Sequence, residues 1–111
     1  MKLDVTMEHQ SAGVINLVVV GVVNIHTSPR LRDALKPLLT EQNKEVHIDL
    51  AGVSFMDSSG IATLVEGLQW ARQSGGRFVL HKLQAVVLDV FMLAKLDTVF
   101  EIAQPLIEDK A

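Results

Sequence analysis

The residues best placed to do chemistry are two adjacent serines in the segment Asp57-Ser58-Ser59-Gly60. An apolar strand pattern ends just before this segment, and the apolar repeat of a helix begins just after it. The first backbone N–H groups of a helix lack partners and lie at the positive end of its dipole. Asp57 or Ser58 can cap them, as in many ordinary helices. The pattern therefore predicts an exposed hydroxyl held rigidly between a strand and a helix, beside a position that tolerates negative charge. Gly60 would let another chain approach the start of the helix.

The chain offers little that could turn these serines into a catalytic site. Its four histidines are His9, His26, His47 and His81. A serine hydrolase built on a nucleophile elbow needs Gly-x-Ser-x-Gly, which is absent, and no histidine has a recognisable acid partner. The histidines lack the spacing of metal ligands, and we expect His47 on the surface of a strand. Gly75-Gly76 lacks the further glycines and the lysine of a phosphate-binding loop. We therefore expect no enzymatic activity, no catalytic residue, no metal and no other cofactor.

Composition narrows the class of protein further. The 111 residues suffice for one domain, residues 1–111, and there is no cysteine for disulfide or thiolate chemistry. A net charge of -3 gives no indication of nucleic-acid binding. The longest apolar stretch, Val14–Val23, has about half of the roughly 20 residues that a membrane-spanning helix needs, and we see no signal peptide. We expect a cytoplasmic protein that binds no nucleic acid and does not insert into a membrane.

Hydrophobic periodicity predicts eight elements in the order β-β-α-β-α-β-α-β. The expected strands cover 4–8, 14–20, 45–50, 77–81 and 99–102. The expected helices run from 28 to near 43, from within 57–60 to 74, and from 84 to 95, with a loop over 21–26 and a closing turn over 105–109. Strand-helix-strand units imply parallel neighbours, whereas the first two strands can form an antiparallel hairpin. The fold class is α/β: one domain with a mixed sheet of about five strands and helices packed mainly on one face.

Several local signals refine these elements. Ser28-Pro29 predicts a helix start with serine as the cap, and Pro37 is expected to kink that helix because it cannot donate a hydrogen bond. The double glycine Gly75-Gly76 is expected to end the second helix. The strand over 14–20 is β-branched and apolar on both faces, which indicates a strand that is covered on both sides.

The segment 53–61 resembles the phosphorylation-site motif of the STAS-domain anti-sigma factor antagonists, which read roughly Asp-Ser-Ser/Thr-Gly after a strand. The resemblance extends over nearly the whole chain. Its further parts are the loop Gly21–Thr27, the strand Glu45–Leu50, the strand entry Gly75–Val79, and a late Phe91 followed by Leu93 and Leu96. Each part is weak alone, and their combination is specific.

This resemblance implies a partner-switching regulator with a single STAS-type domain. In the family, the unphosphorylated antagonist binds a serine kinase that otherwise holds a sigma factor, and the sigma factor is released. The kinase then phosphorylates the serine directly after the aspartate, and a serine phosphatase restores it. Carried over to this chain, Ser58 is the phosphorylation site. Asp57, Ser59 and Gly60, together with Thr27 of the early loop, belong to the partner-binding surface.

The early loop departs from the family pattern. The family usually has Gly-Glu-apolar-Asp there, but this chain reads Gly21-Val22-Val23-Asn24, so both acids are missing. Asn24 keeps hydrogen-bonding capacity without charge, and we place it in the partner-binding surface. The departure affects kinase recognition more than the fold. It also supports an alternative, a non-phosphorylated accessory STAS subunit of a transporter or signalling complex. The oligomeric state stays open, with a weak homodimer as one alternative.

Helical periodicity predicts which apolar side chains could face a partner. On the second helix, Trp70 lies about opposite the core stripe centred near Ile61 and Leu68. On the third, Val87, Phe91 and Ala94 are expected to face inward, and Val86, Met92 and Leu93 to face water. We expect Trp70, Met92 and Leu93 to flank the partner site near Ser58, because contiguous exposed apolar residues mark interfaces. The alternative is that Trp70 folds down against a neighbouring helix.

Overall fold

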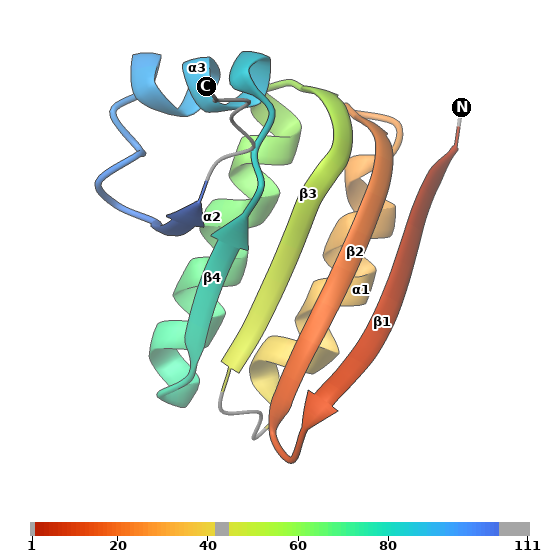
Figure 1. Ribbon diagram of the computed structural model, residues 1–111, viewed down its shortest axis with the longest axis vertical. Coiled ribbons are helices and arrows are strands. Elements are labelled where there is room, and N and C mark those ends of the chain that lie inside the picture. The colour runs from red at the N-terminus through yellow and green to blue at the C-terminus, as the bar shows by residue number, and fades with distance from the viewer. Residues whose placement is uncertain (1, 42–44, 105–111) are drawn as a thin grey trace.

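The computed structural model describes residues 2–41 and 45–104, and it has the predicted order of eight elements (Figure 1). The closing turn expected over 105–109 lies outside the described residues. So does Asn43, near which the first helix was expected to end, but that helix ends earlier, at Thr40. The elements are β1 (Leu3–Ser11), β2 (Val14–Val23), α1 (Ser28–Thr40), β3 (Glu45–Met56), α2 (Ser58–Ser74), β4 (Arg77–His81), α3 (Ala85–Leu93) and β5 (Glu101–Gln104).

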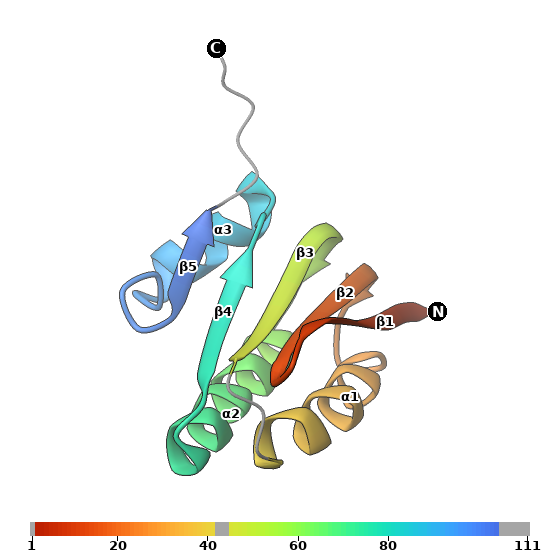
Figure 2. The ribbon, with the colours of Figure 1, turned by 60° about the horizontal axis from the view of Figure 1, so that its bottom comes forward.

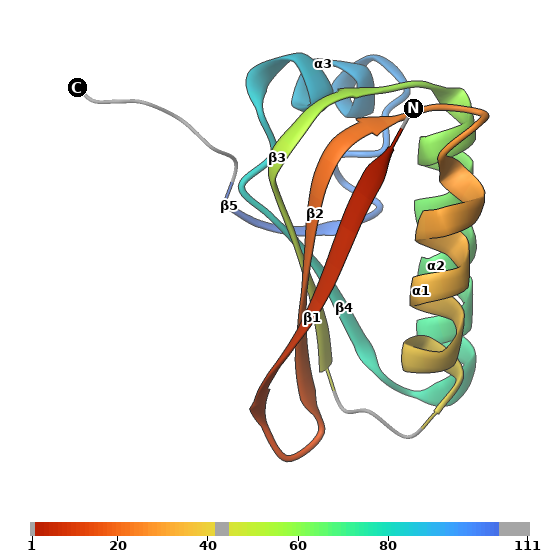
Figure 3. The same ribbon diagram turned by 90° about the vertical axis from the view of Figure 1, so that its right-hand side faces the viewer.

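The five strands form one mixed sheet in the order β1-β2-β3-β4-β5. β1 and β2 form the expected antiparallel hairpin, and each later pair is parallel. α1 and α2 lie side by side against one face of the sheet, and α3 lies across the end at which β3 finishes (Figures 2 and 3). The predicted fold class, a five-stranded mixed sheet with helices mainly on one face, is confirmed.

The core lies between that face of the sheet and the two long helices. On α1, four leucines at helical spacing are buried, Leu31, Leu35, Leu38 and Leu39, as are Ile61, Leu64 and Leu68 on α2. On α3, Val87 and Phe91 are buried as expected, but Ala94 is exposed, because α3 ends at Leu93 and Ala94 only caps it. The prediction that Ala94 faces inward was therefore wrong.

The second face of the sheet is more open than the sequence indicated. Along β2, buried residues such as Leu17 and Val19 alternate with half-buried ones such as Asn16 and Val18. The expectation that β2 is covered on both sides was wrong, because α1 and α2 cover one face only (Figure 3).

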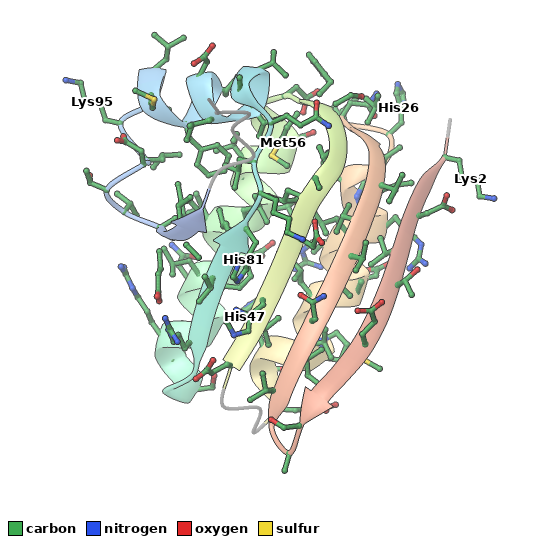
Figure 4. All side chains as sticks on the ribbon, in the orientation of Figure 1. Lys2, His26, His47, Met56, His81 and Lys95 are labelled. Atoms are coloured by element: carbon green, nitrogen blue, oxygen red, sulfur yellow. The ribbon has the colours of Figure 1, made fainter. Side chains whose placement is uncertain are left out.

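A chain of hydrogen bonds crosses this open face from β3 to β4. His47 Nδ1 lies 2.7 Å from His81 Nε2, and His47 Nε2 lies 2.8 Å from Glu45 Oε1 (Figure 4). Arg77 pairs with Glu45 and with Glu101 of β5. Burial is the main cause that lowers the pKa of His81, and the neighbouring His47 lowers it further. Strand residues two apart share a face, so Glu45 lies beside His47 on β3. His47 therefore has an acid partner, which we did not identify from the sequence.

Two strands run further than predicted, so they end directly before Asn24 and Asp57. β2 continues to Val23 and β3 to Met56, where these two residues are paired in parallel. The loop expected from residue 21 therefore begins after Val23. Shifts in register between β2 and β3 absorb the mismatch in length. A bulge of this kind leaves no clear signal in hydrophobic periodicity.

The helix ends follow the predicted chemistry with small shifts. Thr27, not Ser28, occupies the cap position of α1, so Ser28 is the first helical residue and is buried. α1 continues through Pro37 to Thr40. α2 ends at Ser74 as predicted, because Gly75 adopts the left-handed conformation, with φ 77°.

Gly60 lets the first turn of α2 pack directly on the strand ends. A Cβ atom at this position would lie 2.5 Å from Met56 Cγ and 2.7 Å from Val23 Cγ1. Gly60 is itself buried. The close approach that this glycine permits is thus within the domain, and the expectation that it admits another chain was wrong.

Trp70 packs against α1 instead of pointing into water. Its ring lies 5.3 Å from the Arg32 guanidinium carbon and 6.0 Å from Lys36 Nζ, and it contacts the edge of the core. Arg32 is held there by Glu66, with Nε and Oε1 2.8 Å apart. Trp70 lies twelve residues beyond Ser58 on α2, a rise of roughly 18 Å. The alternative weighed for Trp70 is the one the structure adopts.

Replacing Gly60 by alanine should destabilise the domain. Gly60→Ala would insert a methyl group into the contact with Met56 and Val23, and overpacking of this kind costs roughly 1–3 kcal/mol. Gly67→Ala, in the same helix, is the control and should change stability less. Its Cβ would lie 3.2 Å from Leu39 Cδ1, and the higher helix propensity of alanine offsets that crowding. Urea unfolding of both variants measures the difference. Equal stabilities would contradict the packing described for Gly60.

Replacing Trp70 by alanine should lower stability and leave partner binding intact. Trp70→Ala removes a half-buried ring between α1 and α2, which should lower the free energy of unfolding by roughly 2 kcal/mol. Gln69→Ala, at an exposed neighbouring position, should change it by less than about 0.5 kcal/mol. Thermal unfolding and a partner-binding titration provide the two readouts. Normal stability with weakened binding would show that Trp70 belongs to the partner-binding surface.

Candidate functional site

The candidate site lies where two neighbouring parallel strands end. Val23 and Met56, the last residues of β2 and β3, are paired, so the loop after β2 and the start of α2 meet at one end of the sheet. Figure 4 shows Met56 and His26 at this end. The backbone N–H of Asp57 donates to the Val23 carbonyl at 3.0 Å and ties the two segments together.

Asp57 is the cap of α2, one of the two candidates that the sequence offered beside Ser58. Its Oδ1 accepts hydrogen bonds from the Ser59 N–H at 2.9 Å, the Ser59 hydroxyl at 2.6 Å and the Gly60 N–H at 3.3 Å. The Ser59 hydroxyl is the main cause that holds the pKa of the Asp57 carboxyl below its usual range. Burial of the carboxyl opposes this effect, and the backbone N–H groups of Gly60, Ser59 and Ile25 lower the pKa further. Asp57 therefore stays ionised at neutral pH.

The two serines differ sharply in their surroundings. Ser59 is half-buried, and its hydroxyl is engaged by Asp57. Ser58 is the first residue of α2 and is exposed, and its hydroxyl has no hydrogen-bond partner in the part of the chain that the structure describes. Of these two hydroxyls, that of Ser58 is the one open to a second molecule.

Asn24 organises the loop beside this helix start. The side-chain Oδ1 of Asn24 accepts from the backbone N–H groups of His26 at 2.9 Å and Thr27 at 3.2 Å. The backbone N–H of Asn24 donates to the Thr27 hydroxyl. Thr27 is buried, and its hydroxyl donates to the Val22 carbonyl at 2.7 Å. Thr27 thus holds the loop from inside, whereas the half-buried Asn24 lies closer to the surface.

Exposed apolar side chains gather at this end of the molecule. Met92 and Leu93, which the sequence placed toward water, are 53% and 85% exposed on α3, and Val86 is exposed as predicted. α3 lies at the same end as the start of α2 (Figures 1 and 3). The structure thus brings Met92 and Leu93 to the end of the molecule that carries Ser58, whereas Trp70 lies against Arg32 and Lys36 of α1.

Two exposed residues of this region were not found from the sequence. Ile25 follows Asn24 in the loop and is 69% exposed, and Phe55 near the end of β3 is 47% exposed. A phenylalanine in an apolar strand normally indicates core. Here the register of β3 slips between Val53 and Phe55, which places Phe55 outside. Ile25 could have been found as an isoleucine in a loop between two elements.

The described residues contain no group of three or more acidic, histidine or cysteine side chains that could hold a metal ion. Among the described helices, none is long and apolar enough to cross a membrane.

Comparisons with known proteins agree with this geometry. The family model described as "Mlab, STAS domain" matches residues 6–108. The anti-sigma-B factor antagonist of Listeria monocytogenes is 26% identical over 102 residues, which cover 92% of this chain and 90% of that protein. The anti-sigma-B factor antagonist of Bacillus subtilis is 29% identical and covers 85% of each chain.

Solved structures show the same fold. An anti-sigma factor antagonist from Mycobacterium paratuberculosis superposes with a TM-score of 0.81 at 23% identity, over 91% of this chain and 85% of that one. The Bacillus protein SpoIIAA has been solved unphosphorylated and phosphorylated, with TM-scores of 0.76 and 0.71. In these two comparisons the identities are 19% and 18%, with 90% of this chain covered in each, and 88% and 91% of SpoIIAA. The family match and the common fold confirm the resemblance found in the sequence: this chain belongs to the STAS domain family.

Proposed function

We propose that this protein is an anti-sigma factor antagonist that phosphorylation of Ser58 switches off. In its unphosphorylated form it binds a serine-kinase anti-sigma factor in the cytoplasm, and that binding releases a sigma factor. A serine phosphatase returns it to the binding form. Its role is to bind, without catalytic activity of its own. Curated relatives with the name anti-sigma-B factor antagonist support this role.

The observation that carries the proposal is the contrast between Ser58 and Ser59. A kinase needs a hydroxyl that it can reach and orient. The Ser58 hydroxyl is exposed on the first residue of α2, whereas the Ser59 hydroxyl lies 2.6 Å from Asp57 Oδ1 and donates to it. Phosphorylation of Ser59 would have to break that bond and loosen the cap. Phosphorylation of Ser58 leaves the cap in place.

Within the domain, a phosphate on Ser58 meets two opposing effects. It adds a charge of about -1.5 to -2 at neutral pH. The positive end of the α2 dipole favours that charge by roughly 0.3–1 kcal/mol. The ionised Asp57 opposes it, although the hydroxyl and N–H donors around Asp57 Oδ1 partly offset the charge of this carboxylate. The fold should therefore change little on phosphorylation.

The partner complex should respond much more strongly. Ser58 lies at the end of the molecule where Ile25, Phe55, Met92 and Leu93 are exposed, so a partner seated there would exclude water around it. A phosphate pressed into a surface that fits a neutral hydroxyl is a buried, unpaired charge, which costs several kcal/mol. Each 1.4 kcal/mol changes affinity about tenfold, so a loss of a hundredfold or more is expected.

Charge at Ser58 should abolish kinase binding without unfolding the domain. Ser58→Asp should keep a nearly unchanged melting temperature but bind the cognate kinase about a hundredfold or more weakly. Ser58→Ala should bind like the wild type and should not be released when ATP is added. Ser59→Ala is the matched control, and it should still be phosphorylated. Isothermal titration calorimetry and an ATP-chase release assay measure both effects. Equal binding by the Asp and Ala variants of Ser58 would overturn the proposal.

Restoring an acid in the early loop should modestly strengthen the complex. The Asn24 side chain accepts loop N–H groups through its oxygen, which an aspartate oxygen can replace, so Asn24→Asp should keep the loop folded. A contact between surface charges is worth about 1 kcal/mol or less, so affinity for the kinase should rise several-fold at most. Asn24→Ser, which replaces the amide by a neutral hydroxyl and adds no charge, is the control. Unchanged or weaker binding would show that the partner fits a neutral loop.

An accessory STAS subunit of a transporter or signalling complex is the second candidate. The absence of any acid in Gly21–Asn24 favours it, and the matching family model carries the description "Mlab, STAS domain". The partner would then bind the same end of the molecule without phosphorylation. A complex purified from the native cell that lacks a kinase, and in which the Ser58 variants bind equally, would favour this candidate.

A further inference from the structure

The outer edge of the sheet is formed by β1, a nine-residue strand. Within residues 2–41 and 45–104, β1 pairs with β2 and stands at the edge of the sheet. A strand in this position presents a row of backbone N–H and C=O groups that can pair with another strand. This edge lies on the flank of the molecule, away from the start of α2 (Figure 1).

An apolar groove runs beside this edge, between β1 and α1. Its volume is about 370 Å³. Its apolar lining residues are Val5, Met7 and Leu17 from the sheet and Ala34, Pro37 and Leu38 from α1, and the charged side chains of Arg30 and Glu41 complete the lining. Met7 is 47% exposed. A strand added to β1 would therefore find apolar surface on the helix side of the sheet.

We propose that a second copy of this chain occupies the edge, with the two β1 strands antiparallel and Val5 opposite Val5 across a two-fold axis. The resulting dimer has one continuous sheet. A symmetric pair of this kind buries the same patch on both copies. Leu3 of each copy then faces Met7 of the other on the helix side, and the added Val5 and Met7 side chains cover the groove.

Charge on the opposite face favours this register over the two registers next to it. With Val5 on the axis, Lys2 of each copy faces Glu8 of the other, which gives two attractive cross-strand pairs. With Thr6 on the axis, Asp4 would face Glu8, and with Asp4 on the axis, the two Asp4 carboxylates would face each other. Like charges directly opposite are destabilising. Within one chain, Lys2 Nζ lies 3.8 Å from Asp4 Oδ1, and both side chains are largely exposed. Glu8 Oε1 accepts a long hydrogen bond from Asn16 at 3.4 Å, also at the surface. Exposed contacts of this kind contribute little, so Lys2 and Glu8 can exchange them for each other across the dimer.

The dimer leaves both candidate sites open, so it is independent of the switch proposed for Ser58. The two-fold axis makes the β1 strands antiparallel, which places the Ser58 ends at opposite ends of the joined sheet. One dimer could then bind two partner molecules.

Charge reversal tests the register directly. Lys2→Glu or Glu8→Lys replaces two attractive pairs in the dimer by two repulsive ones, so each should weaken dimerisation about tenfold or more. The double variant restores opposite charges and should return to within about threefold of the wild type. Sedimentation velocity, over a range of protein concentrations at low salt, gives the dissociation constants. Lys95→Glu, the same change at a distant corner of the molecule, should have no effect (Figure 4).

Several outcomes would overturn this proposal. For the wild type, these outcomes are a monomer at every concentration or open-ended aggregates. For the variants, they are single variants that dimerise as well as the wild type, or a double variant that dimerises as weakly as the single variants. Far-UV circular dichroism of each variant checks that the fold is retained. Kinase titrations of the monomeric Lys2→Glu variant separate the two proposals, since its affinity for the kinase should equal that of the wild type.

Discussion

The hydrogen bonds around Asp57 are the constraint on which the candidate site depends. The backbone N–H of Asp57 is bound to the end of β2, and its carboxylate accepts from the first turn of α2 and from Ile25 in the neighbouring loop. One residue thus joins two loops and the start of a helix. It also engages the Ser59 hydroxyl, which leaves Ser58 as the exposed serine beside it. Gly60 completes this arrangement, because only a residue without a side chain lets the helix start so close to the strand ends.

This arrangement separates what holds the fold from what meets a partner. Thr27, Ser59 and Gly60 make their contacts inside the domain, although the family resemblance grouped them with the partner surface. Ser58 carries the exposed hydroxyl, with exposed Ile25, Met92 and Leu93 at the same end of the molecule. A motif of four residues therefore contains one outward-facing group and three that fix its position. Such a division permits a change of charge at Ser58 with little effect on the fold.

Much of the fold could be predicted from the sequence because its elements are strongly periodic. The leucine stripe of α1, the cap at Asp57 and the stop at Gly75 each have a local chemical cause. The features that were missed depend on contacts between distant segments. The register slip that turns Phe55 outward, the pairing of His47 with His81, and the packing of the Trp70 ring against Arg32 all arise from neighbours that periodicity does not identify. The open face of β2 was missed because half-buried valines have the same pattern as fully buried ones.

The central claim is that Asp57 fixes the start of α2 so that Ser58, and not Ser59, receives the phosphate. The most direct measurement is fragmentation mass spectrometry of the protein purified from its native cell, with the phosphate localised to a single residue. The account predicts phosphate on Ser58 and unmodified Ser59. Phosphate on Ser59, or a chain that carries no phosphate while its cognate kinase is active, would contradict it.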